Sequence, residues 1–154
     1  MEQIAPHELP GFSEAGIRPE VTSQLTRGVA RLLMDMGCAV LTEMRLANGR
    51  RADLMGICPK GTLTLIEVKS CQADFDVDRK WPDYLDWADR FYFAVDEDFP
   101  HHLLPQEEGM IIADGFGGEI IRESQDRKLN AARRKAVTLR FARQAAFSTF
   151  NTAY

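Results

Sequence analysis

Three residues near the middle of the chain have the types and spacing of a hydrolytic site. Asp53 precedes the turn-forming sequence Pro59-Lys60-Gly61, and Glu67 and Lys69 follow it. If the chain reverses at Lys60, positions equidistant from it face each other across a hairpin, so Asp53 lies opposite Glu67. Because strand side chains alternate with period two, Lys69 shares the face of Glu67.

This arrangement indicates metal-assisted hydrolysis. Two opposed carboxylates repel unless one takes up a proton or a cation lies between them. A hard divalent ion, Mg²⁺ or alternatively Mn²⁺, suits such oxygen ligands. A lysine two positions on orients and helps deprotonate an attacking water, while the metal stabilises charge on a phosphodiester. We therefore expect Asp53 and Glu67 to bind the metal and Lys69 to be catalytic.

The elements that position these residues follow from apolar periodicity and turn signals. We predict a helix from Pro19 to the stop at Gly37, strands over 38–46, 51–58 and 62–69, a partly helical segment over 74–88 interrupted near Pro82, a strand over 91–95, a hairpin with strands over 110–113 and 119–121, and a helix over 129–147. This α-β-β-β-α-β order predicts one α/β domain over 19–154, after a loosely structured arm over 1–18.

The composition agrees with a globular protein. The chain has 154 residues, of which 45% are hydrophobic and 27% charged. Its N-terminus lacks the charge and apolar pattern of a signal peptide, and no apolar run approaches the roughly 20 residues that span a bilayer, so we expect a cytoplasmic protein without a membrane partner. The three cysteines are widely spaced and form no CxxC, so we expect small buried thiols and neither a disulfide framework nor a zinc site.

Charge is divided unevenly along the chain. Residues 1–121 hold 11 Lys and Arg against 21 Asp and Glu, while residues 122–154 hold 8 against 2. Acids around metal ions and bases elsewhere would suit an enzyme acting on a polyanion. From composition alone, solvated surface charge is the favoured explanation. The bases of the last helix encircle it and form no stripe, so a solvated helix is favoured there too, with a phosphate contact by one side as the alternative.

The motif formed by Asp53 and Glu67-Val68-Lys69 resembles that of the PD-(D/E)xK nuclease superfamily. Its restriction-endonuclease-like fold has an αβββαβ core, with a central mixed sheet flanked by helices. The resemblance implies that Asp53 and Glu67 bind metal, that the Val68 carbonyl adds a ligand, and that Lys69 is catalytic. Ala52 stands where the superfamily often has proline, which is not a chemical group in the reaction.

Longer stretches are similar to a narrower family, the bacterial MmcB-like DNA repair proteins. These stretches cover residues 42–45, 49–54, 67–70, 78–84 and 89–95, and the resemblance extends over about 17–122. It implies a role in DNA repair or damage tolerance.

Glu43 is a candidate third carboxylate whose place depends on the hairpin loop before Asp53. A two-residue Asn48-Gly49 loop pairs Asp53 with Met44, whereas a three-residue loop starting at Ala47 pairs it with Glu43. The sequence leaves both registers open.

Three further residues are candidates for binding DNA. Arg51 shares the face of Asp53, where it contacts either a phosphate or the acids. Lys80 and Tyr84 are four apart, which on a helix places them on one side, although Pro82 falls between them. The resemblance to nucleases with a polar-xxx-Tyr helix near the site favours a substrate-side role for Lys80 and Tyr84.

The sequence therefore predicts a magnesium-dependent DNA nuclease acting in DNA repair or damage tolerance. DNA is the expected partner, together with possible repair or replication proteins, and the oligomeric state is left open. The alternative is a non-catalytic DNA-binding or adaptor module on the same fold. Opposed carboxylates near phosphates would repel such a module's ligand, which favours catalysis. The sequence contains no phosphate-binding glycine loop, so it does not support a third function, an enzyme acting on nucleotides or small molecules.

Overall fold

The computed structural model describes residues 14–152 and shows an α/β fold with one mixed sheet of six strands. In order across the sheet, the strands are β1 (Ala39–Arg45), β2 (Arg51–Ile57), β3 (Leu63–Val68), β4 (Arg90–Val95), β5 (Gly109–Ala113) and β6 (Gly118–Arg122). β1, β2 and β3 form an antiparallel meander, β4 is parallel to β3, β5 is parallel to β4, and β6 is antiparallel to β5.

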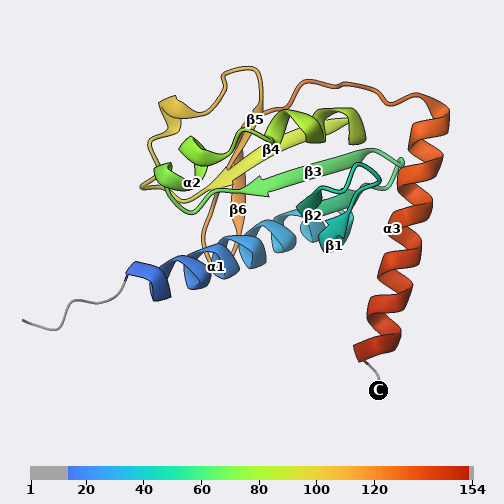
Figure 1. The fold of residues 1–154 in the computed structure, drawn as a ribbon, viewed down its shortest axis with the longest axis horizontal. Coiled ribbons are helices and arrows are strands. Elements are labelled where there is room, and N and C mark those ends of the chain that lie inside the picture. The colour runs from blue at the N-terminus through green and yellow to red at the C-terminus, as the bar shows by residue number, and fades with distance from the viewer. Residues whose placement is uncertain (1–13, 153–154) are drawn as a thin grey trace, which may run out of the picture.

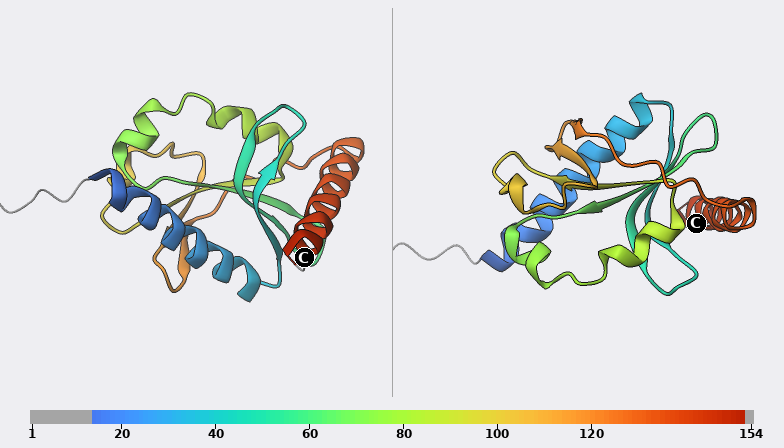
Figure 2. Two further views of the ribbon diagram at one scale, coloured as in Figure 1. Left: turned by 60° about the horizontal axis from the view of Figure 1, so that its bottom comes forward. Right: turned by 90° about the horizontal axis from the view of Figure 1, so that it is seen from above.

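Helices cover both faces of this sheet (Figure 1). α1 (Glu14–Asp35) lies on one face, and α2 (Gln72–Val77) and the 3-10 helix η1 (Trp81–Trp87) lie on the other, as Figure 2 shows. A short 3-10 turn, η2 (His101–Leu103), precedes β5, and α3 (Ala131–Thr152) closes the chain. The predicted αβββαβ order is confirmed, and with the mixed sheet it gives a restriction-endonuclease-like core. None of the helices within 14–152 has the length and apolar character to cross a membrane.

α1 buries an apolar stripe against the sheet, formed by Leu25, Val29 and Leu33. The helix ends at Asp35, shortly before Gly37, whose φ of 81° lies in the left-handed region that glycine adopts without strain. There the N–H of Gly37 donates to the Met34 carbonyl and the N–H of Cys38 to the Leu33 carbonyl, which is the Schellman pattern of a helix end. Because the helix ends sharply here, β1 begins at Ala39.

The start of α1 differs from the prediction. The helix begins at Glu14, so residues 14–18 of the predicted arm are helical and Pro19 lies inside the helix. Proline lacks the N–H of a helix interior, which is why Pro19 indicated a helix start. The helical turn before it shows that one missing hydrogen bond near the end is tolerated. The rest of the predicted arm, 1–13, lies outside the described residues, as do 153 and 154.

The segment between β3 and β4 also differs from the single interrupted helix predicted over 74–88. The break falls at 78–80, between α2 and η1, and Pro82 lies inside the first turn of η1. Proline fits a first turn because the N–H that it lacks has no partner there. Lys80 therefore lies before η1 and Tyr84 within it, so the two residues do not share one α-helical face.

Aromatic side chains form the core beneath η1. The Trp81 ring lies 5.9 Å from Phe91 and 5.3 Å from Phe93, and Phe75 meets Phe93 edge to face at 5.6 Å. Trp81 therefore packs on the sheet, as do most aromatic residues in such positions.

Helix α3 docks beside the free edge of β1. Val137 and Phe141 are buried against the sheet, and Arg134 makes a two-pronged ion pair with Asp89 at 2.6 and 2.7 Å. The Gln144 amide donates to the Glu43 carbonyl and accepts the Arg45 N–H, each at 3.0 Å. Gln144 thus satisfies part of the open backbone edge of β1. One side of this basic helix is therefore structural, in contrast to the expected solvated helix.

The expectation of free thiols is wrong for two of the cysteines. Cys38 and Cys58 form a disulfide, with their Cα atoms 3.9 Å apart. The register pairs Ala39 with Ile57, so the residues directly before β1 and after β2 face each other. Antiparallel pairing therefore brings together two cysteines that no spacing motif connects. Cys71 is a free, half-buried thiol.

Candidate active site

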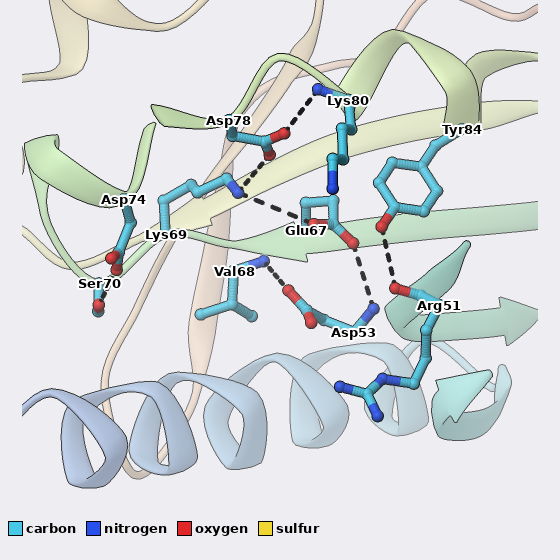
Figure 3. Close-up of polar contacts among 10 residues, drawn as sticks. All are labelled: Arg51, Asp53, Glu67, Val68, Lys69, Ser70, Asp74, Asp78, Lys80 and Tyr84. Atoms are coloured by element: carbon cyan, nitrogen blue, oxygen red, sulfur yellow. Dashed lines mark hydrogen bonds and ion pairs between the residues drawn. The ribbon is translucent and has the colours of Figure 1, made fainter. Parts of the chain in front are cut away.

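The predicted carboxylate pair is present at the junction of β2 and β3 (Figure 3). Leu54 pairs with Ile66, so the register places Asp53 opposite Glu67, as the turn position predicted. The Val68 N–H donates to Asp53 Oδ2 at 2.8 Å, and the Asp53 N–H donates to Glu67 Oε1 at 3.3 Å. Each carboxylate is therefore held by the neighbouring strand.

Burial of the pair makes its negative charge unfavourable. Burial, followed by the charge of Asp53, raises the pKa of Glu67 to about 8 from an ordinary 4.5. Burial also raises the pKa of Asp53, although the hydrogen bond from Val68 N–H opposes this shift. The two groups interact strongly, so near neutral pH the pair retains about one proton in the absence of a cation.

Lys69 lies beside this pair but is held by another acid. Its Nζ is 3.9 Å from Glu67 Oε2 and 2.5 Å from Asp78 Oδ2. Burial acts to raise the pKa of Asp78, but hydrogen bonds from Lys69 Nζ and Lys80 N–H outweigh it and lower that pKa. Asp78 therefore keeps its charge and fixes the lysine ammonium next to the carboxylate pair.

The sequence did not assign a role to Asp78. It lies in the irregular break between α2 and η1, where no strand register predicts which side chains meet. Its only signal was its place in a stretch that is similar to the MmcB-like proteins.

The β1–β2 hairpin has the three-residue loop, with the Arg50 carbonyl accepting the Leu46 N–H. This register pairs Thr42 with Leu54 and so places Glu43 opposite Asp53, where Glu43 adopts a positive φ of 55°.

Glu43 is therefore close to the pair. Burial is the main cause of the raised pKa of Asp53, and the charge of Glu43 adds to it, whereas the Val68 N–H and Lys69 oppose it. The Glu43 carboxylate forms an ion pair with Arg51 Nε at 2.6 Å, and both side chains are more than half exposed. Glu43 and Arg51 thus contact each other at the rim of the site.

Lys80 and Tyr84, the other two candidates for binding DNA, occupy different positions. Tyr84 is buried and its hydroxyl donates to the Arg51 carbonyl at 2.9 Å, which supports the start of β2. Lys80 is exposed, and Figure 3 shows its side chain extended towards Glu67. Lys80 is thus placed to meet a ligand at the pair, whereas Tyr84 has a structural contact.

Asp53 and Glu67 are the residues that would hold a divalent ion at this site. Within the described residues, no three His, Cys, Asp or Glu side chains converge on one point. Mg²⁺ is commonly bound through one or two carboxylates, with water and substrate phosphate completing the shell. Asp53 Oδ1 accepts no hydrogen bond from any described residue, so it is available as a ligand beside Glu67. Burial destabilises the charged form of both carboxylates and so raises their pKa values. A bound cation would offset this destabilisation.

The fold and this site define an α/β protein with a restriction-endonuclease-like core and a buried Asp–Glu pair next to a lysine. The family model described as DNA repair protein MmcB-like matches residues 12–153, and the chain belongs to this family.

One solved structure is similar over most of the chain. It is described as the SPO1766 protein of unknown function from Silicibacter pomeroyi, with 46% identity and a TM-score of 0.81 over 83% of this chain and 88% of that one. A search of curated proteins finds no match.

Proposed function

We propose that this DNA repair family member is a magnesium-dependent DNA nuclease of the PD-(D/E)xK superfamily, which hydrolyses phosphodiester bonds. The observation that carries the proposal is the buried Asp53–Glu67 pair with Lys69 Nζ 3.9 Å from Glu67. Within residues 14–152 neither carboxylate has an ion pair shorter than this contact, so a cation would offset the charge of the pair.

Each residue has a separate role in this proposal. Asp53 and Glu67 would hold Mg²⁺, which when bound stabilises the charge that develops on the phosphodiester. Lys69 orients the attacking water and stabilises it as it loses its proton. Asp78 holds Lys69 in place, and Lys80 and Arg51 at the rim contact phosphates of the DNA.

A specific observation also favours the alternative, a non-catalytic DNA-binding or adaptor module. Lys69 contacts Asp78 at 2.5 Å and Glu67 at 3.9 Å, so its ammonium is already engaged. In such a module the pair and Lys69 serve only to join the strands, and divalent metal has no effect on DNA.

A cleavage assay separates the two functions. Purified protein is incubated with labelled single-stranded, duplex, flapped and branched DNA in Mg²⁺, Mn²⁺ or chelator. The nuclease is expected to cleave at least one substrate only with metal, and Asp53→Asn and Glu67→Gln are expected to abolish cleavage. Glu119→Gln on β6, an exposed acid at the opposite edge of the sheet, is the matched control.

Calorimetric titration with Mg²⁺ tests the metal site independently of cleavage. Binding should disappear in the Asp53→Asn, Glu67→Gln double variant, and the metal should raise the melting temperature of the wild type. DNA binding without metal-dependent cleavage of any substrate would support the adaptor module instead.

A further inference from the structure

A groove runs along one side of helix α3, and the edge strand β1 contributes Arg45 to its lining. Its volume is about 620 Å³, and its lining includes Arg45, Leu139, Arg140, Arg143 and Phe147. The hydrogen bonds of Gln144 to the β1 backbone fix the helix along this side of the groove.

The groove gathers cations that have no acidic partner. α3 carries five basic residues and no acid. Arg134 pairs with Asp89, and Arg133 donates to the Asp86 carbonyl. By contrast, the exposed side chains of Arg45, Arg140 and Arg143 make no hydrogen bond or ion pair with any residue in the described part of the chain. Uncompensated charge of one sign along a groove attracts a polyanion.

An exposed aromatic ring lies among these cations. Phe147 is 60% exposed, and the Arg143 guanidinium carbon is 5.6 Å from its ring centroid. Proteins bind single-stranded nucleic acids by stacking bases on aromatic rings while basic side chains contact the phosphates. In a duplex the bases are stacked on each other, so a single strand fits this combination better.

Strand pairing connects the β1 end of the groove with the rim of the candidate site. Arg45 pairs with Arg51 across β1 and β2, and Arg51 precedes Asp53 by two residues. Two residues along a strand span roughly 7 Å. A strand of DNA that contacts Arg45 and continues across Arg51 therefore reaches the rim of the site.

We propose that the groove between β1 and α3 binds a single-stranded segment of DNA and leads it to the Asp53–Glu67 pair. Its phosphates contact Arg45, Arg140 and Arg143, and a base stacks on Phe147. The delivery of the strand for cleavage rests on the proposed nuclease function, whereas binding in the groove does not. A second copy of α3 would repel this face because that helix has no acidic residue.

Fluorescence anisotropy in chelator, with the full chain and labelled oligothymidine of about 20 nucleotides, tests the groove without cleavage. The Arg140→Ala, Arg143→Ala double variant is expected to bind at least tenfold more weakly. The slope of log affinity against log salt should fall by about 1.4, since each single-strand phosphate contact contributes about 0.7. Phe147→Ala should weaken binding about 5- to 100-fold, and Phe147→Trp should restore it.

Two matched controls address general loss of charge or apolar surface. Lys60→Ala removes an exposed cation at the turn between β2 and β3, away from Arg45, and Phe116→Ala removes an 83% exposed ring beyond β5. Both should bind like the wild type, and circular dichroism checks that every variant is folded. Wild-type affinity in the groove variants, or equal losses in the controls, would overturn the proposal.

Other results distinguish this inference from the nuclease proposal. Asp53→Asn should bind the single strand normally but not cleave it. If the wild type binds through the groove and cleaves nothing, the nuclease proposal is refuted and the proposal of single-strand binding in the groove is supported. If the wild type cleaves while the groove variants bind and cleave normally, only the proposal that the groove binds DNA is refuted. Concentration-dependent dimers that dissociate in Phe147→Ala, or binding of an acidic helical peptide in preference to DNA, would assign this face to protein contacts and overturn the inference.

Discussion

Burying two carboxylates side by side costs free energy, because each loses hydration and each repels the other. In this protein, backbone N–H groups of Asp53 and Val68 and the ammonium of Lys69 offset part of that cost, but the pKa of Glu67 still rises to about 8. A bound proton or cation would offset the remaining repulsion between the two carboxylates. The charge of this site therefore depends on both pH and divalent metal.

The first prediction concerns pH in the absence of metal. The pKa of Glu67 is about 8 in the folded protein against an ordinary 4.5, so between these values the folded state keeps a proton that the unfolded chain releases. This contribution to stability is fully present below about pH 4.5 and is lost as the pH rises through 8. Each pKa unit corresponds to about 1.4 kcal/mol, so the loss is on the order of a few kcal/mol.

Thermal unfolding in chelator from pH 5 to 9 measures this loss. Glu67→Gln removes the titrating group, so its melting temperature should vary less with pH than that of the wild type. The control Glu119→Gln should keep the wild-type dependence. Equal slopes for Glu67→Gln and the wild type would contradict the raised pKa.

The second prediction concerns Asp78. Because it holds Lys69 at 2.5 Å, Asp78→Asn should reduce metal-dependent cleavage by about tenfold or more, and Lys69→Ala by about 10²–10⁴. Metal affinity should change little in both variants. A double-mutant cycle of cleavage rates is decisive: if Asp78 acts through Lys69, then Asp78→Asn causes little further loss in the Lys69→Ala background. Fully additive losses would show that Asp78 acts independently of Lys69.

At the scale of the elements, Asp89 connects the C-terminal segment to the sheet. Its buried carboxylate accepts the N–H groups of Leu63 at 2.8 Å and Leu129 at 2.9 Å, in addition to the ion pair with Arg134. Burial acts to raise the pKa of Asp89, but these hydrogen bonds outweigh it and lower that pKa. The stabilisation is therefore present above the ordinary value of 3.8 and is lost as the pH falls through the folded value.

The third prediction follows from this connection. Asp89→Ala leaves two buried N–H groups and the Arg134 guanidinium without their acceptor, so the free energy of unfolding should fall by about 3 kcal/mol. Urea denaturation near neutral pH measures it. Asp86→Ala, an exposed acid three residues earlier, is the control and should change stability by less than about 0.5 kcal/mol. A small effect of Asp89→Ala would mean that α3 does not depend on this ion pair.

Local signals predicted the elements and one register, but not the other contacts. The tight turn at Lys60 fixes the pairing of β2 with β3, so the juxtaposition of Asp53 and Glu67 could be derived from the chain alone. The β1–β2 register could not, because the loops starting at Ala47 and Asn48 were both compatible with the sequence. The positive φ angles of Gly49 and Glu43 accompany the register that forms.

Two side-chain contacts that hold the site and the sheet edge could not be derived from local patterns. Asp78 reaches Lys69 from an irregular segment, and Gln144 reaches the β1 backbone from 99 residues away. Neither contact follows from a periodicity or a turn. The strand pairing that brings Cys38 to Cys58 was predicted only approximately, because its register depended on the unresolved choice of loop.

For the whole molecule, the disulfide is the covalent constraint on the meander that carries the site. It joins the end of α1 and the start of β1 to the end of β2, with a sequence separation of 20. Closing a loop of this length reduces the conformational freedom of the unfolded chain, by an amount worth about 3 kcal/mol. The opposite end of the same strands carries Glu43 and Asp53, so the link also limits fraying towards the site.

The last prediction is that reduction destabilises the folded protein without changing its site. Dithiothreitol, or Cys38→Ser, should lower the free energy of unfolding by about 3 kcal/mol, whereas Cys71→Ser, which removes the free half-buried thiol, should have a much smaller effect. Maleimide labelling under denaturing conditions without reductant should modify Cys71 alone, and all three cysteines after reduction. Labelling of all three before reduction would contradict the disulfide. Because the cross-link lies at the far end of β1 and β2 from Asp53, magnesium affinity measured at a temperature where the reduced protein remains folded should stay the same.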